Sequence, residues 1–249
     1  MTQKAGLAPR DGKRASFNPD IHRRGQNSQI LGCQTITSEN GRDTAEIILT
    51  DELPNGSGFV RHLFNNINDV ILKTTNKQDD EGYLEQIHSD SHSNDCKDAC
   101  YDCLKVFRNM NYHGLLDWRL GIALLRIMID KDYKAGADGK FYKYLELKDW
   151  QENAFEDAKL FSKSFGFELL DITYMPVIKT PTNIFLIVIH PLWKCKIKDG
   201  QPSTPEGWIE SEFEKVFEYA NGSDHIRFID SFNLHRRPGW CYQKFLLDQ

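Results

Sequence analysis

The chain has 249 residues and a mass of 28.8 kDa, which corresponds to one large domain or two small ones at roughly 100–200 residues per domain. Hydrophobic residues make up 40% and charged residues 27%, the usage of an ordinary globular protein, so wholesale disorder is excluded. A net charge of −5 excludes a chain that binds nucleic acid through bulk positive charge, and no uncharged apolar run reaches the ~18 residues of a membrane span.

The first 30 residues form the most basic stretch of the sequence, with six basic and two acidic side chains and almost no apolar periodicity. We predict a disordered basic arm over residues 1–30. The first 25 residues also lack the apolar segment of a secretory signal, which predicts a cytoplasmic protein.

The first ordered unit is predicted over residues 31–135. Residues 45–50 favour a strand, and residues 54–58 break it with a proline and two glycines. Residues 59–73 repeat apolar side chains at helical spacing, residues 74–95 are polar and suggest a loop, and residues 114–130 are apolar on more than one side, which is typical of a buried helix.

A glycine-bearing linker at residues 131–141 is followed by a small α/β domain, predicted over 141–249. Asp149 can cap a helix that ends at Gly166, with Glu152 three residues after the cap. Residues 167–174, 184–190 and 226–229 favour strands, and 208–220 a helix. The alternation predicts an α/β fold of layered helices and short strands with a cysteine-rich metal knuckle.

The sharpest local signal is a group of three cysteines, Cys96, Cys100 and Cys103, within eight residues. Two residues separate Cys100 from Cys103, which allows both sulfurs to face one ion from a tight turn. Zn²⁺ takes four tetrahedral ligands and prefers sulfur and imidazole nitrogen. In a cytoplasmic protein such a cluster indicates bound Zn²⁺ more often than a disulfide, although a buried or redox-active thiol set is the alternative.

The fourth ligand is not fixed by the spacing. His92, four residues before Cys96, is the best candidate, and His88 is the second. The remaining cysteines are distant in sequence and would reach the site only through tertiary folding; they are Cys33, Cys195 and Cys241. A closed site with four protein ligands would hold a structural metal, because no position is left for a reactive water.

Three motifs surround this cluster. They run from Asp51 to Arg61 (DELPNGSGFVR), from Cys100 to Leu104 (CYDCL) and from Asn109 to Arg119 (NMNYHGLLDWR). Together they resemble the MrfA-type zinc-binding domain at the C-terminal end of certain superfamily-two DNA helicases, and they are similar to the related domain of the DrmB subunit of DISARM phage-defence systems. The family commonly places four ligands here, whereas this chain offers three cysteines.

The resemblance implies a partner. The chain lacks a Gly-x-x-x-x-Gly-Lys-Ser/Thr phosphate-binding loop, so the ATP-driven motor would be a separate polypeptide or would have been lost. We therefore expect a non-catalytic zinc-binding accessory protein of a superfamily-two helicase or related DNA-processing assembly, including phage defence, with DNA as a further partner and no membrane. The alternatives are a nuclease or hydrolase in the C-terminal α/β part, or a direct single-stranded nucleic-acid binder.

Two further groups of residues invite a functional interpretation. Asn109, His113, Asp117 and Arg119 are predicted to form a polar network that locks the knuckle onto the following helix. Within it, His113 and Asp117 are four residues apart, so we expect them to share a helix face and form a hydrogen bond. The segment at residues 235–244 interleaves cations with aromatic rings, which suits nucleic acid or a protein interface. The candidate binding residues there are Arg236, Arg237, Trp240 and Lys244.

Overall fold

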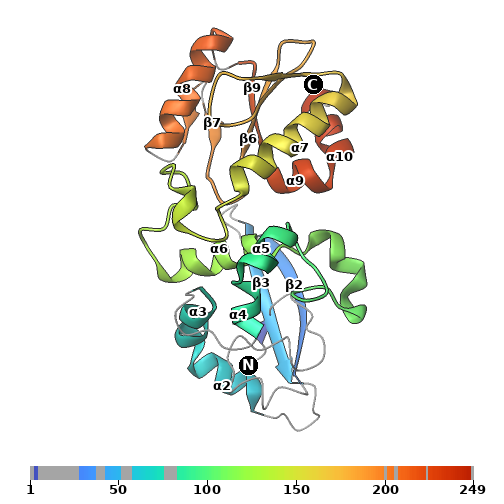
Figure 1. The fold of residues 1–249 in the computed structure, drawn as a ribbon, viewed down its shortest axis with the longest axis vertical. Coiled ribbons are helices and arrows are strands. Elements are labelled where there is room, and N and C mark those ends of the chain that lie inside the picture. Colours follow the sequence, from blue (N-terminus) through green and yellow to red (C-terminus); the bar gives the residue numbers. More distant parts are fainter. Residues whose placement is uncertain are drawn as a thin grey trace. The chain divides into compact units, whose positions relative to one another are not determined.

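The computed structural model describes residues 3–4, 28–37, 43–51, 58–75, 83–198, 201–204, 207–222 and 224–247 (Figure 1). The chain divides into two compact units, Met1–Asp130 and Lys131–Gln249. The predicted basic arm lies outside the described residues, apart from residues 3–4 and 28–30. None of the described helices combines the length and the apolar character that crossing a bilayer requires.

Unit 1 contains an antiparallel sheet in the order β1-β3-β2. The strands are β1 (Gln3–Lys4), β2 (Ser28–Thr37) and β3 (Asp43–Asp51). The predicted strand at 45–50 lies within β3. β2 was not predicted, and its pairing with β3 shifts register between Ile30 and Gly32, so its sequence does not alternate evenly along the strand.

The helices of unit 1 follow the sheet. They are α2 (Phe59–Asn65), α3 (Ile67–Thr75), α4 (Tyr83–Ile87), α5 (Asp90–Asp95), the 3₁₀ helix η2 (Phe107–Leu115) and α6 (Trp118–Ile129). The single helix predicted over 59–73 is therefore two helices. Asn66 separates them. Its side-chain amide donates to the His62 carbonyl at 2.7 Å and so competes with the backbone hydrogen bonds of the helix.

The region predicted as a loop at 74–95 contains α4 and α5. Ser89 begins α5, since its hydroxyl accepts a hydrogen bond from the His92 backbone N–H at 3.1 Å. Helix α6 also differs from its prediction. Ile122 and Ala123 are buried, whereas Leu124, Ile127 and Met128 are 48%, 41% and 65% exposed, so α6 is covered on one side only.

Unit 2 is built on a four-stranded sheet in the order β4-β5-β6-β9. The strands are β4 (Glu168–Leu170), β5 (Val177–Lys179), β6 (Phe185–Ile189) and β9 (Ile226–Asp230). The first three are antiparallel and β9 runs parallel to β6, which needs a crossover connection through α8 (Trp208–Ala220). All five residues of β6 are buried, as expected for a strand covered on both faces.

Helices cover both faces of this sheet. Figure 1 shows α8 on one side and α7 (Trp150–Phe165), α9 (Ser231–Arg236) and α10 (Pro238–Tyr242) on the other. The remaining elements are the 3₁₀ helix η3 (Phe141–Lys143), the hairpin strands β7 (Lys196–Lys198) and β8 (Gln201–Ser203), and the π-helix η4 (Gln243–Leu247). This arrangement confirms the predicted α/β fold of layered helices and short strands.

The segment predicted as a linker at 131–141 belongs to the core of unit 2. Ala135 and Ala137 are buried, and the Ala135 carbonyl accepts a hydrogen bond from Trp193 Nε1 at 2.9 Å. Gly136 has a φ of +85°, which favours glycine, and its Cα faces the Phe141 ring. A Cβ at this position would clash with that ring, so the close turn requires glycine. Asp149 precedes α7 as predicted, but its side chain makes no capping hydrogen bond.

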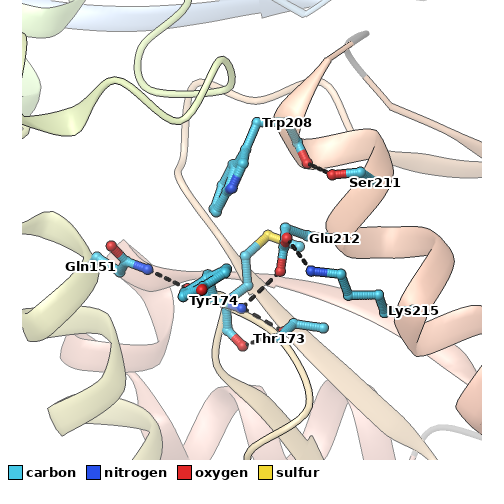
Figure 2. Close-up of polar contacts among 8 residues, drawn as sticks. Gln151, Thr173, Tyr174, Trp208, Ser211, Glu212 and Lys215 are labelled. Atoms are coloured by element: carbon cyan, nitrogen blue, oxygen red, sulfur yellow. Dashed lines mark hydrogen bonds and ion pairs between the residues drawn. The ribbon is translucent and has the colours of Figure 1, made fainter.

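A buried carboxylate fixes α8 to the turn before β5 (Figure 2). Glu212 accepts hydrogen bonds from the Tyr174 backbone N–H at 2.8 Å and from Lys215 Nζ at 2.6 Å. On the other side of the turn, Gln151 of α7 donates to the Tyr174 carbonyl at 2.5 Å. Both oxygens of Glu212 thus hold structural partners, which explains how a carboxylate is tolerated at 2% exposure.

Candidate metal centre

Four potential metal ligands of unit 1 come together in one place. The ligand atoms of His92, Cys96, Cys100 and Cys103 all lie within 4.8 Å of one another. Helix α5 carries His92 and ends at Cys96, which is its C-cap residue, while the following turns present Cys100 and Cys103. Among the described residues, this is the only group of three or more His, Cys, Asp or Glu side chains arranged in this way.

The spacing of these atoms matches a tetrahedral ion. The Cys96 and Cys103 sulfurs are 3.8 Å apart, the Cys100 and Cys103 sulfurs 3.7 Å, and the Cys100 sulfur lies 3.6 Å from His92 Nε2. Tetrahedral zinc with Zn–S bonds of ~2.3 Å and Zn–N bonds of ~2.0–2.1 Å places two sulfurs ~3.8 Å apart and sulfur and nitrogen ~3.5–3.6 Å apart. These three separations therefore fit tetrahedral zinc, and all four ligand atoms lie within 4.8 Å of one another.

The turn that carries Cys100 and Cys103 is closed by its own backbone. The Cys100 carbonyl accepts hydrogen bonds from the backbone N–H groups of Cys103, at 3.3 Å, and of Lys105, at 2.9 Å. The Cys100 backbone N–H in turn lies 3.0 Å from the Cys103 sulfur, which it can stabilise as a thiolate. A separation of two residues between the cysteines is what permits this closed turn.

His92 is oriented by a contact on its other ring nitrogen. Nδ1 lies 3.0 Å from the carbonyl oxygen of Ile87. A carbonyl can only accept, so Nδ1 carries the hydrogen and Nε2, which faces the sulfurs, keeps its lone pair. An imidazole held through its second nitrogen is the usual arrangement of a metal-binding histidine.

Helix α6 packs against the cluster and forms hydrogen bonds with it. Trp118 Nε1 donates to the Cys96 carbonyl at 3.0 Å, and the ring of Trp118 packs against His92 with centroids 5.2 Å apart. Arg119 Nη2 donates to the Ser93 carbonyl at 2.5 Å, and its guanidinium lies over the Trp118 ring at 4.6 Å. The first turn of α6 thus contacts two residues of the cluster and the helix that carries His92.

The predicted polar network is present in part. The Asn109 side chain is buried and accepts from the Val106 backbone N–H at 2.7 Å, and His113 Nε2 lies 2.9 Å from Asn109 Oδ1. Asp117 serves a different purpose from the predicted hydrogen bond to His113. It caps α6 by accepting from the Leu120 backbone N–H at 2.9 Å, because η2 ends at Leu115 and the two residues do not share a helix.

The electrostatics of the cluster favour one thiolate in the absence of an ion. The hydrogen bond with Cys96 lowers the pKa of Cys103 to about 4, and the same contact raises the pKa of Cys96 above its ordinary value. Burial raises the pKa of Cys100, and the hydrogen bond with Cys103 raises the pKa of His92. A divalent cation stabilises all three thiolates together, so its binding releases protons.

Most of the cluster is buried. Cys96, Cys103 and His92 are buried, and Cys100 is half-buried. Four protein donors complete a tetrahedral shell, which is the arrangement of structural zinc sites and leaves no open position for water. Such a centre can cross-link α5, the cysteine turn and, through Trp118, α6.

The other candidate ligands lie elsewhere. His88 Nε2 is 3.0 Å from the Thr74 carbonyl, where it contributes to the packing of α3 rather than to the cluster. Cys195 and Cys241 are free cysteines of unit 2. Cys33 lies in β2, and its side chain is outside the described residues.

The predicted nucleic-acid or partner residues lie at the end of unit 2. Arg236 is the last residue of α9, Arg237 joins α9 to α10, Trp240 lies in α10 and Lys244 in η4. Within the described part of unit 2, no three acidic, histidine or cysteine side chains gather as at the knuckle. The nuclease or hydrolase alternative therefore stays a prediction from sequence.

Sequence reasoning missed two of the groups that hold the centre. Trp118 was identified only as part of a motif, and the Ile87 carbonyl carries no side-chain signal at all. The one sequence signal that favours Trp118 is its position directly after Asp117, the residue that begins α6. An indole at the first turn of a helix can reach the preceding knuckle.

Comparison with known proteins adds one match. The model of the MrfA Zn-binding domain family matches residues 24–104, which include His92 and the three clustered cysteines. The match confirms the predicted resemblance to the MrfA-type zinc-binding domain, and it ends at Leu104, before the motif at 109–119. Searches of curated proteins and of solved structures each found no match. Residues 24–104 of this chain are therefore similar to the MrfA Zn-binding domain, and the histidine and cysteines within them are a donor set that fits zinc.

Proposed function

We propose that this chain is a non-catalytic zinc-binding accessory protein of a superfamily-two DNA helicase or a related DNA-processing assembly, of which a phage-defence system is one kind. Its zinc ligands are His92, Cys96, Cys100 and Cys103. The observation that carries the proposal is the closed histidine and cysteine cluster inside a segment that matches the MrfA Zn-binding domain. A closed zinc site supplies rigidity rather than chemistry, which suits a docking module.

The spatial arrangement supports a role in shaping a surface. Zinc would connect α5 to the cysteine turn, and Trp118 and Arg119 would connect both to α6. The segments around the centre present several large exposed side chains: Tyr101, Phe107, Met110, Tyr112 and Leu115. Aromatic residues and methionine are enriched in the centres of protein interfaces, so a zinc-fixed knuckle would present them in one conformation.

The first test concerns the metal. Elemental analysis of the purified full chain should give one zinc per chain, and Cys100→Ser should lower this value to well below one. Cys195→Ser is the matched control, because Cys195 is a free cysteine of unit 2, and it should keep the zinc. A wild-type chain that folds without metal would overturn the assignment of the site.

The second test concerns the partner. The tagged full chain, expressed at native level in its source cells and cross-linked, should enrich an ATP-dependent DNA helicase. The purified helicase should then change its ATPase or strand-separation rate when the chain is added, and Cys100→Ser should abolish the change while Cys195→Ser should not. Zinc binding without any such effect on a co-purifying helicase would leave the metal site intact and refute the accessory role.

A further inference from the structure

The C-terminal segment of unit 2 has a charge opposite to that of the whole chain. Residues 231–247 contain three cations, Arg236, Arg237 and Lys244, and no aspartate or glutamate, whereas the chain carries a net charge of −5. Arg236 ends α9, Arg237 alone separates α9 from α10, and Lys244 lies in η4, which directly follows α10. A local cationic surface on an acidic chain selects an anionic partner.

Two of these cations lie over aromatic rings. The Arg236 guanidinium is 4.2 Å from the centroid of the Phe232 ring, and Lys244 Nζ is 4.6 Å from the centroid of Trp240. Each pair is four residues apart, which places both members on one side of the helix. The contacts restrict the long side chains before any partner arrives, so less entropy is lost on binding.

The helices that carry these groups are anchored to the rest of unit 2. His235 Nδ1 lies 2.9 Å from Asp157 Oδ1 of α7, and the Tyr242 ring stacks on Phe165 with centroids 4.5 Å apart. Leu234 of α9 and Cys241 of α10 are also buried. The surface residues therefore have a fixed support, which a binding site needs and a flexible terminus lacks.

The outer side of this segment is open. Trp240 is 39% exposed, and Arg237 and Lys244 are exposed as well. Among the described residues, no carboxylate forms an ion pair with Arg237 or Lys244. An exposed indole beside cations combines the two contacts that unpaired nucleotides require, a ring for the base and a positive charge for the phosphate.

We propose that the surface formed by Arg236, Arg237, Trp240 and Lys244 binds single-stranded nucleic acid, with one base stacked on Trp240 and the adjacent phosphates on the three cations. Bases of a duplex are already stacked on their neighbours, so the indole favours single strands. An acidic peptide would use the cations but would gain little from Trp240. The surface lies in unit 2 and the zinc cluster in unit 1, so this inference does not depend on the helicase association.

The test uses the purified full chain and fluorescence polarisation. The probe is a 5′-labelled oligothymidylate of 20 nucleotides, and the same-length duplex and a polyglutamate peptide are competitors. We expect binding that weakens with salt, with a slope of log K against log salt near −2, since three phosphate contacts contribute roughly −0.7 each on single strands. The oligothymidylate should compete at least tenfold better than the duplex.

Matched variants separate stacking from charge. Trp240→Ala should weaken binding about tenfold, because a stacked base contributes roughly 1–3 kcal/mol, and Trp240→Phe should restore most of the loss. Lys244→Gln should reduce the magnitude of the salt slope by about 0.7. Tyr142→Ala and Lys148→Gln, which change exposed residues elsewhere in unit 2, should bind like the wild type.

Three results would overturn the proposal. They are an absence of oligothymidylate binding, equal losses in Tyr142→Ala and Trp240→Ala, and stronger competition by polyglutamate than by oligothymidylate, which would assign the surface to an acidic peptide. Circular dichroism verifies that each variant is folded. None of these results bears on zinc content or on helicase association, so failure here is distinguishable from failure of the proposed function.

Discussion

Trp118 Nε1 donates a hydrogen bond to the carbonyl oxygen of Cys96 across 3.0 Å, and this contact joins the first turn of α6 to the metal cluster. Both residues are buried, Trp118 at 3% and Cys96 at 4% exposure. The bond spans 22 positions of sequence. It therefore couples the position of α6 to the geometry of the metal ligands.

Trp118→Phe should loosen the metal centre without removing a ligand. The variant keeps an aromatic ring against His92 but loses the hydrogen bond, which costs about 1–3 kcal/mol when a buried acceptor is left without its donor. We expect faster zinc transfer to a chromogenic chelator and a lower melting temperature. Trp240→Phe, at an exposed position, is the control and should transfer zinc at the wild-type rate; equal rates in both variants would show that the bond does not support the site.

Removal of the metal should unfold the knuckle and spare unit 2. The cluster connects α5 to the cysteine turn, and without an ion only thiol hydrogen bonds replace the metal–ligand bonds. After chelation, hydrogen exchange should accelerate over residues 87–120 and remain slow in β6 and β9. Fast exchange throughout the chain, or no change anywhere, would contradict this view of the metal as a local cross-link.

The stability of unit 2 should fall in mild acid because of His190. Burial lowers the pKa of His190 to about 3, below the ordinary 6.5 of an unfolded histidine. Between these two values the unfolded state binds a proton that the folded state does not, so the free energy of unfolding decreases by about 1.4 kcal/mol per pH unit as the pH falls below 6.5. Above pH 6.5 this contribution is constant.

His190→Asn should flatten that dependence. An asparagine keeps an acceptor for the Leu192 backbone N–H, which now donates to His190 Nδ1 at 3.2 Å, but it does not titrate. Denaturant unfolding at pH 5, 6 and 7 measures the slope. His225→Gln changes an exposed histidine of the same unit and should keep the wild-type slope; a wild-type slope in His190→Asn would refute the assignment.

Gly136→Ala should destabilise unit 2 more than an ordinary helix substitution. Its φ of +85° is unfavourable for alanine, and an added Cβ would lie 2.5 Å from Phe141 Cε1, so we expect a loss of about 2–4 kcal/mol. Gly239→Ala in α10 is the matched control. Its Cβ would meet no atom within 4 Å, so stability should stay the same or rise by about 0.5 kcal/mol. Thermal melts compare the two, and equal effects would contradict the close packing of Gly136.

The two long helices of unit 2 were readily predicted from the sequence, whereas β5 and the short helices α9 and α10 were not. Helices α7 and α8 follow their apolar periodicity, and their ends lie at Gly166 and Asn221, both in the left-handed conformation. The break at Asn66 and the uncovered side of α6 were not predicted. Periodicity indicates which face of a helix is apolar. It does not indicate what covers that face, or where a polar side chain interrupts the backbone hydrogen bonds of the helix.

The sequence by itself determined that three thiols lie close enough to share an ion, because Cys96, Cys100 and Cys103 cannot separate far along eight residues. It left the fourth donor open between two histidines and three distant cysteines. Only the tertiary structure placed His92 with the sulfurs and turned His88 toward Thr74. The reason is that this choice depends on the Ile87 carbonyl, the start of α5 at Ser89 and the indole of Trp118, and these contacts exist only in the folded chain.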